Sequence, residues 1–271
     1  IWVENPNSDV SDLLLDVANG TINFTVADST IVSVYKNFIP EIRVAMTLSE
    51  GDWLAWAFQK RHDKSLIEEA ERYFAFIEEN GDLQRIKERY YRHSNAFDYV
   101  GTRTFRRHIE QRLNKYQGKF IDAGDNTGID WRLLAALSYQ ESHWNPNAVS
   151  PTGVRGLMML TQRTASVLGV SDRIDPEQSI HGGAEYLKRL KSRIAPQIRE
   201  PDRTWLALAA YNVGYGHLRD AQNIVRKQRG NPNSWLDVKQ ALPLLAKRKY
   251  YSETTYGYAR GWEPVKYVEN I

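Results

Sequence analysis

Cysteine is absent from the 271 residues, which excludes disulfides, thiolate nucleophiles and zinc-thiolate sites. Histidine occurs six times, and no two histidines have the HExxH spacing or a similar spacing of metal ligands. We therefore predict no metal site and no cofactor.

Long apolar runs are also absent, because no stretch approaches the roughly 20 residues that span a bilayer. The chain is expected to be soluble as given. Charge of one sign is not in excess, with 36 basic and 33 acidic residues and a net charge of +3. This balance argues against a nucleic-acid partner and allows at most a mild preference for an anionic polymer.

The composition is that of a globular chain, with 42% hydrophobic and 25% charged residues. Its length favours two domains. Residues 1–92 have an α/β pattern, in which strand-like alternation follows one helix and precedes two others. The expected helices are Asp12–Ala18, Ser65–Glu79 and Leu83–Tyr91, and the expected strands are Ile22–Val26, Glu41–Leu48 and Asp52–Phe58.

Periodicity is lost after this region, so residues 93–104 are predicted to form a linker. Residues 105–271 then have a helical pattern almost throughout, without strand alternation, internal repeats or low-complexity tracts. The expected helices are Phe105–Asp125, Trp131–Ser142, Thr161–Leu168, Pro176–Ile194, Asp202–Asn212, Gly216–Arg229 and Ser234–Leu245.

Glu141 is the most informative single residue. Asp130 can cap a helix whose apolar stripe includes Leu133 and Leu137, and a further step of four residues reaches Glu141. A carboxyl on the core-facing side of a helix is partly desolvated, which raises its pKa and suits a general acid. The alternative is a structural helix-end carboxylate paired with Arg155, with Arg163 or with a backbone donor.

The segment after Glu141 contains glycines at which the backbone can bend close to a ligand, and Ser150 could donate a hydrogen bond there. Met158 and Met159 follow in "GLMML", and ordinary core packing is the simplest role for them.

Three motifs together resemble the lytic transglycosylases that have a goose-lysozyme-like catalytic domain. They are the ES pair in "ALSYQESHWNPNAVS", the loop "GVRGLMML" and the segment "LALAAYNVGYG", and they occur in the order typical of that family. The resemblance covers about residues 105–271 and implies an all-α lysozyme-like domain. The end of the chain, "YYSETTYGYARGWEPVKYV", resembles one membrane-bound branch.

The resemblance assigns Glu141 as the catalytic acid and then base. It places Ser150 and Tyr211 near the catalytic carboxyl or the sugar, with Met158 and Met159 in the substrate loop. Met159 stands where the family has glutamine, which removes an amide expected to contact substrate. Among the aromatic residues that could stack on sugars, Tyr256 is a further candidate besides Tyr211 and Tyr215.

The implied reaction is cleavage of peptidoglycan glycan strands without water, which gives a 1,6-anhydromuramoyl product. No second acidic residue occurs between Glu141 and Leu160, whereas ordinary glycoside hydrolases use two carboxylates. Two alternatives stay open, namely a hydrolytic muramidase and a wall-binding sensor that has no catalytic activity.

Residues 1–92 resemble a lobe of periplasmic solute-binding proteins of the amino-acid type, expected to be incomplete here. The resemblance makes a muropeptide or an amino acid the regulatory ligand and Asp28 its contact, while a helix cap for residues 29–35 is the alternative. It also implies the periplasm, with peripheral association to the outer membrane of a Gram-negative bacterium.

Overall fold

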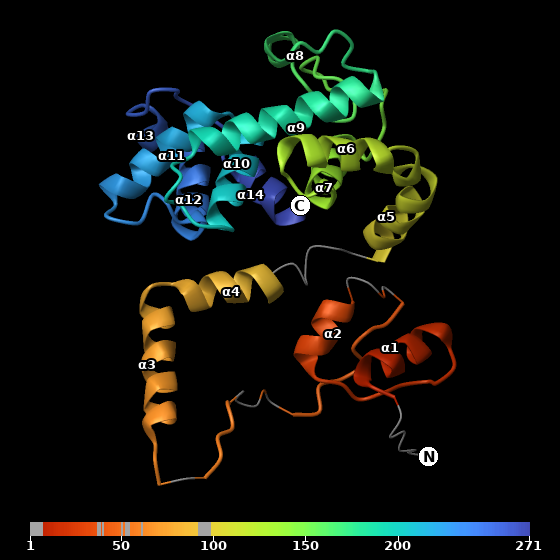
Figure 1. The fold of residues 1–271 in the computed structure, drawn as a ribbon, viewed down its shortest axis with the longest axis vertical. Coiled ribbons are helices and arrows are strands. Elements are labelled where there is room, and N and C mark those ends of the chain that lie inside the picture. The colour runs from red at the N-terminus through yellow and green to blue at the C-terminus, as the bar shows by residue number, and fades with distance from the viewer. Residues whose placement is uncertain are drawn as a thin grey trace. The chain divides into compact units, whose positions relative to one another are not determined.

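The structure is a computed structural model. It describes residues 8–36, 39, 41–49, 51, 55–60, 62–91 and 99–271. The chain divides into two compact units, Ile1–Thr104 and Phe105–Ile271. Each unit is described by itself (Figure 1).

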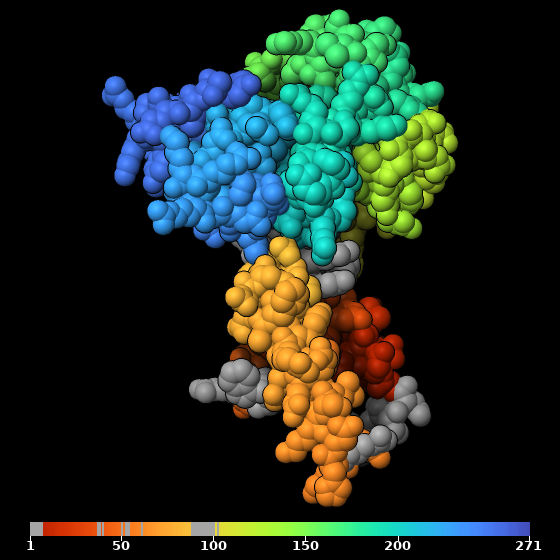
Figure 2. Space-filling view, turned by 60° about the vertical axis from the view of Figure 1, so that its left-hand side comes forward, coloured from red at the N-terminus to blue at the C-terminus, as the bar shows by residue number. Residues whose placement is uncertain are grey.

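The first unit is helical in its described part. Its helices are α1 (Val10–Asn19), α2 (Ser29–Tyr35), α3 (Ser65–Glu79) and α4 (Asp82–Tyr91). A small core forms from Leu14, Ile39 and Ile42, with partly buried residues of α1 and α2 around it. In the space-filling view α3 is the orange column (Figure 2). Its apolar side chains include Leu66 and Phe76, which are 67% and 60% exposed.

The strands expected in this unit are not formed in its described residues, which corrects that part of the α/β prediction. Residues 52–54 of the third run lie outside the described part. A strand is stable only when its backbone pairs with a neighbour. The described residues provide no such neighbour here, and Phe24 and Met46 remain 67% and 72% exposed.

The second unit is an all-α domain. Its elements are α5 (Tyr99–Gln111), which begins in the first unit, η2 (Leu113–Lys115), α6 (Gln117–Thr127), α7 (Trp131–Ser142), α8 (Gln162–Leu168), α9 (Pro176–Arg193), α10 (Asp202–Val213), α11 (Tyr215–Lys227), α12 (Trp235–Ala241), η3 (Leu242–Ala246), α13 (Arg248–Tyr251) and α14 (Trp262–Asn270).

Helix α10 is central to this unit, because it packs against α9, α11 and α14. It consists largely of small and apolar residues, so neighbouring helices can approach it closely on several sides. Five consecutive residues of α10, Leu206 to Ala210, are buried. Helices α6 and α7 pack against each other, and both contact α9 (Figure 1).

Most helices expected after residue 104 are present with bounds within a few residues. The expected helix Phe105–Asp125 is divided, because α5 ends at Gln111 and η2 separates it from α6. Helix α5 also begins at Tyr99, so residues 99–104 of the expected linker are helical, while residues 93–98 lie outside the described part. Helix α14 was not expected.

Candidate active site

Helix α7 brings Glu141 to the end of a buried helix. The Asp130 carboxylate accepts a hydrogen bond from the Arg132 backbone N–H at 2.8 Å, which confirms the predicted cap. Leu134 and Leu137 are fully buried on the core side. At the other end His143 and Trp144 have φ angles of 51° and 54°, so the helix stops directly after Ser142. Glu141 therefore lies on its last turn.

Trp144 secures this helix end. Its side chain is 2% exposed, and its Nε1 donates a hydrogen bond to the Ala135 carbonyl at 2.8 Å. Left-handed φ angles are costly for residues other than glycine. Burial of the indole and its hydrogen bond offset that cost and hold the turn after Glu141 against α7.

The loop after Glu141 is anchored to three helices through its backbone. The Leu157 carbonyl accepts hydrogen bonds from the hydroxyls of Ser138 and Ser142 on α7, at 3.0 and 2.9 Å. On α9, the Ser179 hydroxyl accepts a hydrogen bond from the Met158 N–H at 3.2 Å. These bonds hold the loop beside the end of α7 that carries Glu141.

Gly156 is required for this arrangement. Its φ is 84°, and a Cβ at this position would come within 1.8 Å of the Arg173 carbonyl oxygen. Only glycine allows such close backbone contact. The sequence prediction of a glycine-dependent bend is correct at this position.

Tyr211 on α10 completes the anchoring of the loop. Its hydroxyl donates a hydrogen bond to the Met158 carbonyl at 2.9 Å. Burial raises the pKa of Tyr211 well above its usual range, and the charges of Glu141 and Tyr186 raise it further. Tyr211 therefore stays protonated, and its pKa responds to the charge of Glu141.

Tyr267 on α14 is the direct partner of Glu141. Its hydroxyl donates a short hydrogen bond to Oε1 of Glu141, and only 4% of the residue is exposed. Sequence analysis missed this residue because it did not identify α14. The available signal was the helical spacing of Pro264, Tyr267 and Val268, which are all buried.

Burial raises the pKa of Glu141 to about 7, and the hydrogen bond from Tyr267 acts in the opposite direction. Within the described part of the chain, Glu141 forms no ion pair with Arg155 or Arg163, both of which are exposed. The structural alternative of an Arg-paired carboxylate is therefore wrong. A carboxyl of this kind is protonated in a large share of molecules at neutral pH and can donate a proton.

Three other predicted residues have mainly local contacts. The Ser150 hydroxyl lies 2.9 Å from the Thr152 hydroxyl and accepts hydrogen bonds from the N–H groups of Thr152 and Val154. Met158 is fully buried, and its side chain packs against Gly183, as core packing requires. Met159 is half-buried with a φ of 46°.

Two further aromatic candidates lie near the start of α11. Tyr256 is 59% exposed, and its ring lies against Gly216. Tyr215 donates a hydrogen bond to the Arg193 carbonyl at 2.9 Å, and the Arg193 guanidinium lies 3.9 Å from the centre of its ring. Both polar contacts of Tyr215 are therefore with Arg193, the last residue of α9.

Asp28 lies in the first unit and caps α2. Its carboxylate accepts a hydrogen bond from the Thr30 N–H at 2.7 Å. This interaction with Thr30 lowers the pKa of the Asp28 carboxyl. The cap that sequence analysis left as an alternative is thus formed.

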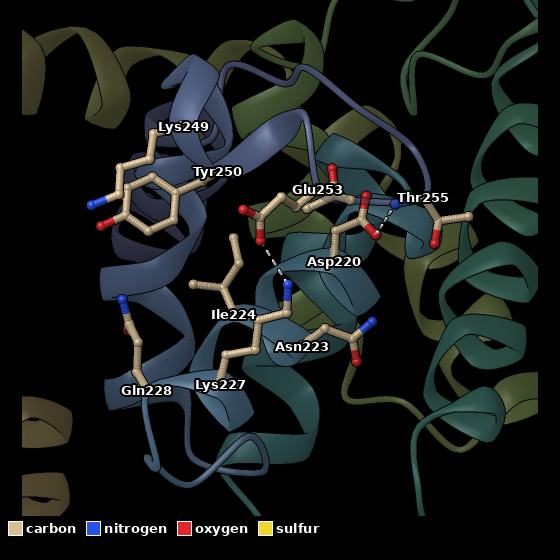
Figure 3. Close-up of a pocket in the computed structure, with 10 residues that line it drawn as sticks. Asp220, Asn223, Ile224, Lys227, Gln228, Lys249, Tyr250, Glu253 and Thr255 are labelled. Carbon is tan, nitrogen blue, oxygen red and sulfur yellow. Dashed lines mark hydrogen bonds and ion pairs between the residues drawn. The ribbon is translucent and has the colours of Figure 1, made fainter.

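The pocket shown in Figure 3 belongs to the second unit, and neither Glu141 nor Tyr267 lines it. It has a volume of about 410 Å³ between α11 and α13 and is lined by residues such as Asp220, Ile224 and Tyr250.

The described residues contain no group of three or more His, Cys, Asp or Glu placed to hold a metal ion. They also contain no helix that is long and apolar enough to cross a bilayer.

Comparison with known proteins defines the class of this domain. Residues 118–233 match the family model of the Transglycosylase SLT domain. The chain therefore carries a transglycosylase SLT domain, and this domain contains Glu141, the glycine-rich loop and Tyr211.

Whole-chain relatives are more specific. The chain is 51% identical over 270 residues to membrane-bound lytic murein transglycosylase F 1 of Alkalilimnicola ehrlichii, covering 100% of this chain and 55% of the relative. It is 51% identical to membrane-bound lytic murein transglycosylase F of Saccharophagus degradans and 50% identical to that of Pseudomonas putida, each over 270 residues, covering 100% of this chain and 54% and 56% of these relatives. The predicted resemblance is confirmed, and the chain spans about half the length of these curated relatives.

Proposed function

We propose that this chain is the catalytic part of a peptidoglycan lytic transglycosylase. It cleaves the β-1,4 bond between N-acetylmuramic acid and N-acetylglucosamine without water and forms a 1,6-anhydromuramoyl product. The observation that carries the proposal is Glu141, a desolvated carboxyl hydrogen-bonded to Tyr267 at the edge of a rigid loop.

Glu141 acts first as an acid. Its proton goes to the glycosidic oxygen, the bond from C1 to that oxygen breaks, and the substrate's own acetamido group stabilises the positive charge at C1. The pKa of about 7 leaves much of Glu141 protonated at neutral pH, as this step requires. Acid catalysis of this kind contributes a factor of about 10² to 10⁴.

Glu141 then acts as a base. The carboxylate takes the proton from the C6 hydroxyl of the muramic acid, and O6 attacks C1 to close the anhydro ring. Glu141 regains its proton, so the cycle consumes no water. The hydrogen bond from Tyr267 favours the ionised form between the two steps.

A hydrolase would need a second carboxylate to activate water or to act as nucleophile. No second acidic residue occurs between Glu141 and Leu160, the stretch that forms the helix end and the loop of the site. This favours the non-hydrolytic reaction over a muramidase.

The test is mass spectrometry of muropeptides released from purified peptidoglycan by the chain and by its Glu141→Gln variant. Anhydro products, one water lighter than hydrolytic products and lost in the variant, support the proposal. Reducing-end products indicate a muramidase instead. A chain that binds glycan without turnover indicates a wall-binding sensor.

A role in substrate binding is proposed for Ser150, Met159, Tyr211 and Tyr256. Tyr211 acts through the loop, because it anchors the Met158 carbonyl. Ser150 needs only a rotation of its exposed hydroxyl to reach a ligand, while Tyr256 offers an exposed ring for a sugar.

For residues 1–92 we propose part of a regulatory solute-binding lobe that takes a wall peptide or an amino acid. The alternating apolar runs and the exposed apolar side chains of α3 support it, because both need further partners to be buried. The relatives are nearly twice as long as this chain.

The proposed ligand contact in this lobe is the Asp28 carboxylate, which would bind the ammonium group of the ligand. Asp28→Asn separates this role from capping, because asparagine caps helices as well as aspartate does. Binding of free amino acids or muropeptides is measured by calorimetry. Loss of binding with unchanged helix content supports the ligand role, and unchanged binding leaves only the cap.

Location follows the same proposal. The printed names of the relatives call them membrane-bound murein transglycosylases. We place this chain in the periplasm, in peripheral association with the outer membrane, where the glycan strands of peptidoglycan are its partner.

A further inference from the structure

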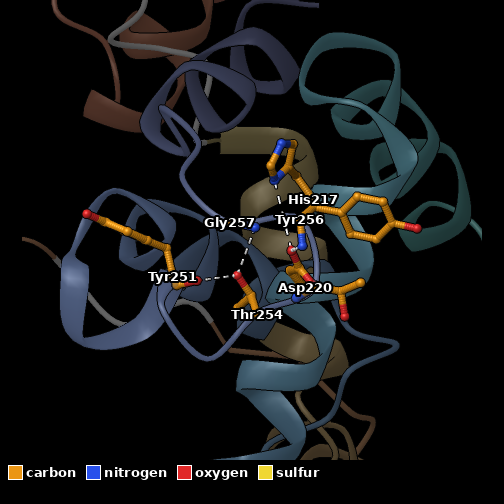
Figure 4. Close-up of polar contacts among 7 residues, drawn as sticks. His217, Asp220, Tyr251, Thr254, Tyr256 and Gly257 are labelled. Atoms are coloured by element: carbon orange, nitrogen blue, oxygen red, sulfur yellow. Dashed lines mark hydrogen bonds and ion pairs between the residues drawn. The ribbon is translucent and has the colours of Figure 1, made fainter.

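Tyr256 belongs to the irregular segment between α13 and α14, and the buried carboxylate of Asp220 holds this segment in place. Oδ1 of Asp220 accepts a hydrogen bond from the Thr255 N–H at 3.1 Å, and Oδ2 accepts one from the Tyr256 N–H at 2.9 Å (Figure 4). The Asp220 side chain is only 2% exposed. Two consecutive backbone amides of the segment are thus fixed to α11.

Thr254 adds a second constraint on the same segment. Its hydroxyl donates a hydrogen bond to the Tyr251 carbonyl at 2.9 Å and accepts one from the Gly257 N–H at 3.2 Å. Gly257 has a φ of 76°, which permits the bend after Tyr256. The backbone is therefore constrained on both sides of Tyr256.

The Tyr256 ring rests on α11. A Cβ at Gly216 would come within 2.7 Å of two ring atoms, so the ring lies directly on the glycine backbone. The residue nevertheless remains 59% exposed. An aromatic ring that is held in position and still exposed is suited to stack on the apolar face of a sugar ring.

The two elements that hold this ring are close in sequence to two tyrosines of the Glu141 site. Gly216 follows Tyr211 by five residues, and Tyr256 precedes Tyr267 by eleven residues. Tyr211 and Tyr267 are the tyrosines whose pKa values respond to the charge of Glu141. Tyr256 is therefore held by two elements whose neighbours in sequence, α10 and α14, carry the tyrosines next to Glu141.

We propose that Asp220 is a positioning residue for glycan binding, which acts by holding Tyr256 as a stacking surface for a sugar ring of the substrate. The inference rests on the proposed function, because it takes a glycan strand as the ligand. His217 borders the arrangement, with its Nδ1 4.0 Å from Oδ2 of Asp220 and its ring 6.1 Å from that of Tyr256.

The test is binding of a chitin hexasaccharide to the full chain in the Glu141→Gln background, so that turnover does not contribute. Asp220→Asn preserves the side-chain shape, but its amide nitrogen cannot accept the second backbone N–H. Losing this bond is expected to weaken binding about fivefold. Tyr256→Ala should weaken it at least as much, and the double variant should add little to Tyr256→Ala alone.

Gly216→Ala is the second perturbation. It leaves both hydrogen bonds of Asp220 in place and displaces only the ring, so it separates ring placement from folding. Asp202→Asn is the matched control, because Asp202 is also buried and also accepts a backbone N–H, that of Trp235 at 2.8 Å. It lies at the other end of α10 from Tyr211, about 14 Å away along the helix. It should lower stability without changing glycan affinity.

Breaking the ion pair Lys227–Glu253 is a further control. Lys227 on α11 and Glu253 on the turn that precedes Thr255 lie 2.9 Å apart, and both line the pocket of Figure 3. Lys227→Ala should leave binding unchanged, since the bonds to Asp220 remain.

The inference is overturned if Asp220→Asn or Gly216→Ala binds the hexasaccharide as tightly as the parent, or if the effects of Asp220→Asn and Tyr256→Ala are additive. The proposed function is tested separately by product analysis of the chain with its native Glu141. A chain that binds glycan through Tyr256 but releases no anhydro product would keep the inference and reject the activity.

Discussion

Replacement of Glu141 by glutamine should change stability with a definite dependence on pH. The pKa of this carboxyl is about 7 in the folded chain, against 4.5 for the unperturbed group. Between these values the unfolded chain ionises Glu141 while the folded chain keeps the proton. The folded state then binds more protons, so stability falls as the pH rises.

The size of the effect follows from the shift. A difference of about 2.5 pKa units corresponds to about 3 kcal/mol. The folded chain is destabilised by this full amount above pH 7 and is not destabilised below pH 4.5. Glutamine does not ionise and can still accept the hydrogen bond from Tyr267. Glu141→Gln should therefore be more stable than the parent at pH 8, and this advantage should shrink by about 2 to 3 kcal/mol at pH 5.

Urea unfolding followed by tryptophan fluorescence at pH 5 and pH 8 measures this difference. The control is Glu177→Gln, because Lys119 lowers the pKa of that exposed carboxyl, and its removal should give no gain at pH 8. An advantage of Glu141→Gln that is equal at both pH values would refute the view that burial makes Glu141 an acid.

Three further changes test other parts of the site. Tyr267→Phe removes the hydrogen bond that favours the carboxylate, so the pKa of Glu141 should rise further, and the decline of kcat/KM at alkaline pH should move to higher pH. Gly156→Ala should destabilise the chain by at least about 2 kcal/mol in thermal unfolding, whereas Gly153→Ala, with a similar φ but nothing within 4 Å, should cost about 1 kcal/mol. Met159→Gln should lower the KM for peptidoglycan about threefold by supplying the family's amide, and an unchanged KM would exclude that contact.

Sequence periodicity predicted the helical unit well where local signals were strong. Helix α7 agrees with the prediction at both ends, since Asp130 caps its start and the residues before Pro146 end it. The break between α5 and α6 could not be predicted, because amphipathic spacing continues across Arg112–Tyr116.

The strands were predicted from alternation alone, and alternation does not supply a pairing partner. Ile22, Phe24 and Val26 fit a sheet, but a sheet forms only where a second strand satisfies the backbone groups. Residues 41–49 also alternate without a pairing strand, and Val44 and Met46 remain exposed in the described structure. Sequence pattern gives local preference, and the partner decides whether a strand forms.

The candidate site was predicted only in part for a related reason. Glu141 and Tyr211 lie in recognisable motifs, whereas Tyr267 is 126 residues away from Glu141 on α14, a helix that packs against α10. Nothing in the local sequence around Tyr267 indicates that partner. Long-range hydrogen bonds of this kind depend on the fold.

The two tyrosines next to Glu141 explain how one carboxyl can serve both halves of the proposed reaction. Tyr211 donates a hydrogen bond to the Met158 carbonyl, so it fixes the loop and leaves the protonation of Glu141 to burial. Tyr267 donates a hydrogen bond to Glu141 itself, so it stabilises the ionised form. An acid that must become a base in the next step needs a pKa near the working pH. Burial raises the pKa of Glu141 and the hydrogen bond from Tyr267 lowers it, and the balance of the two is a pKa of about 7.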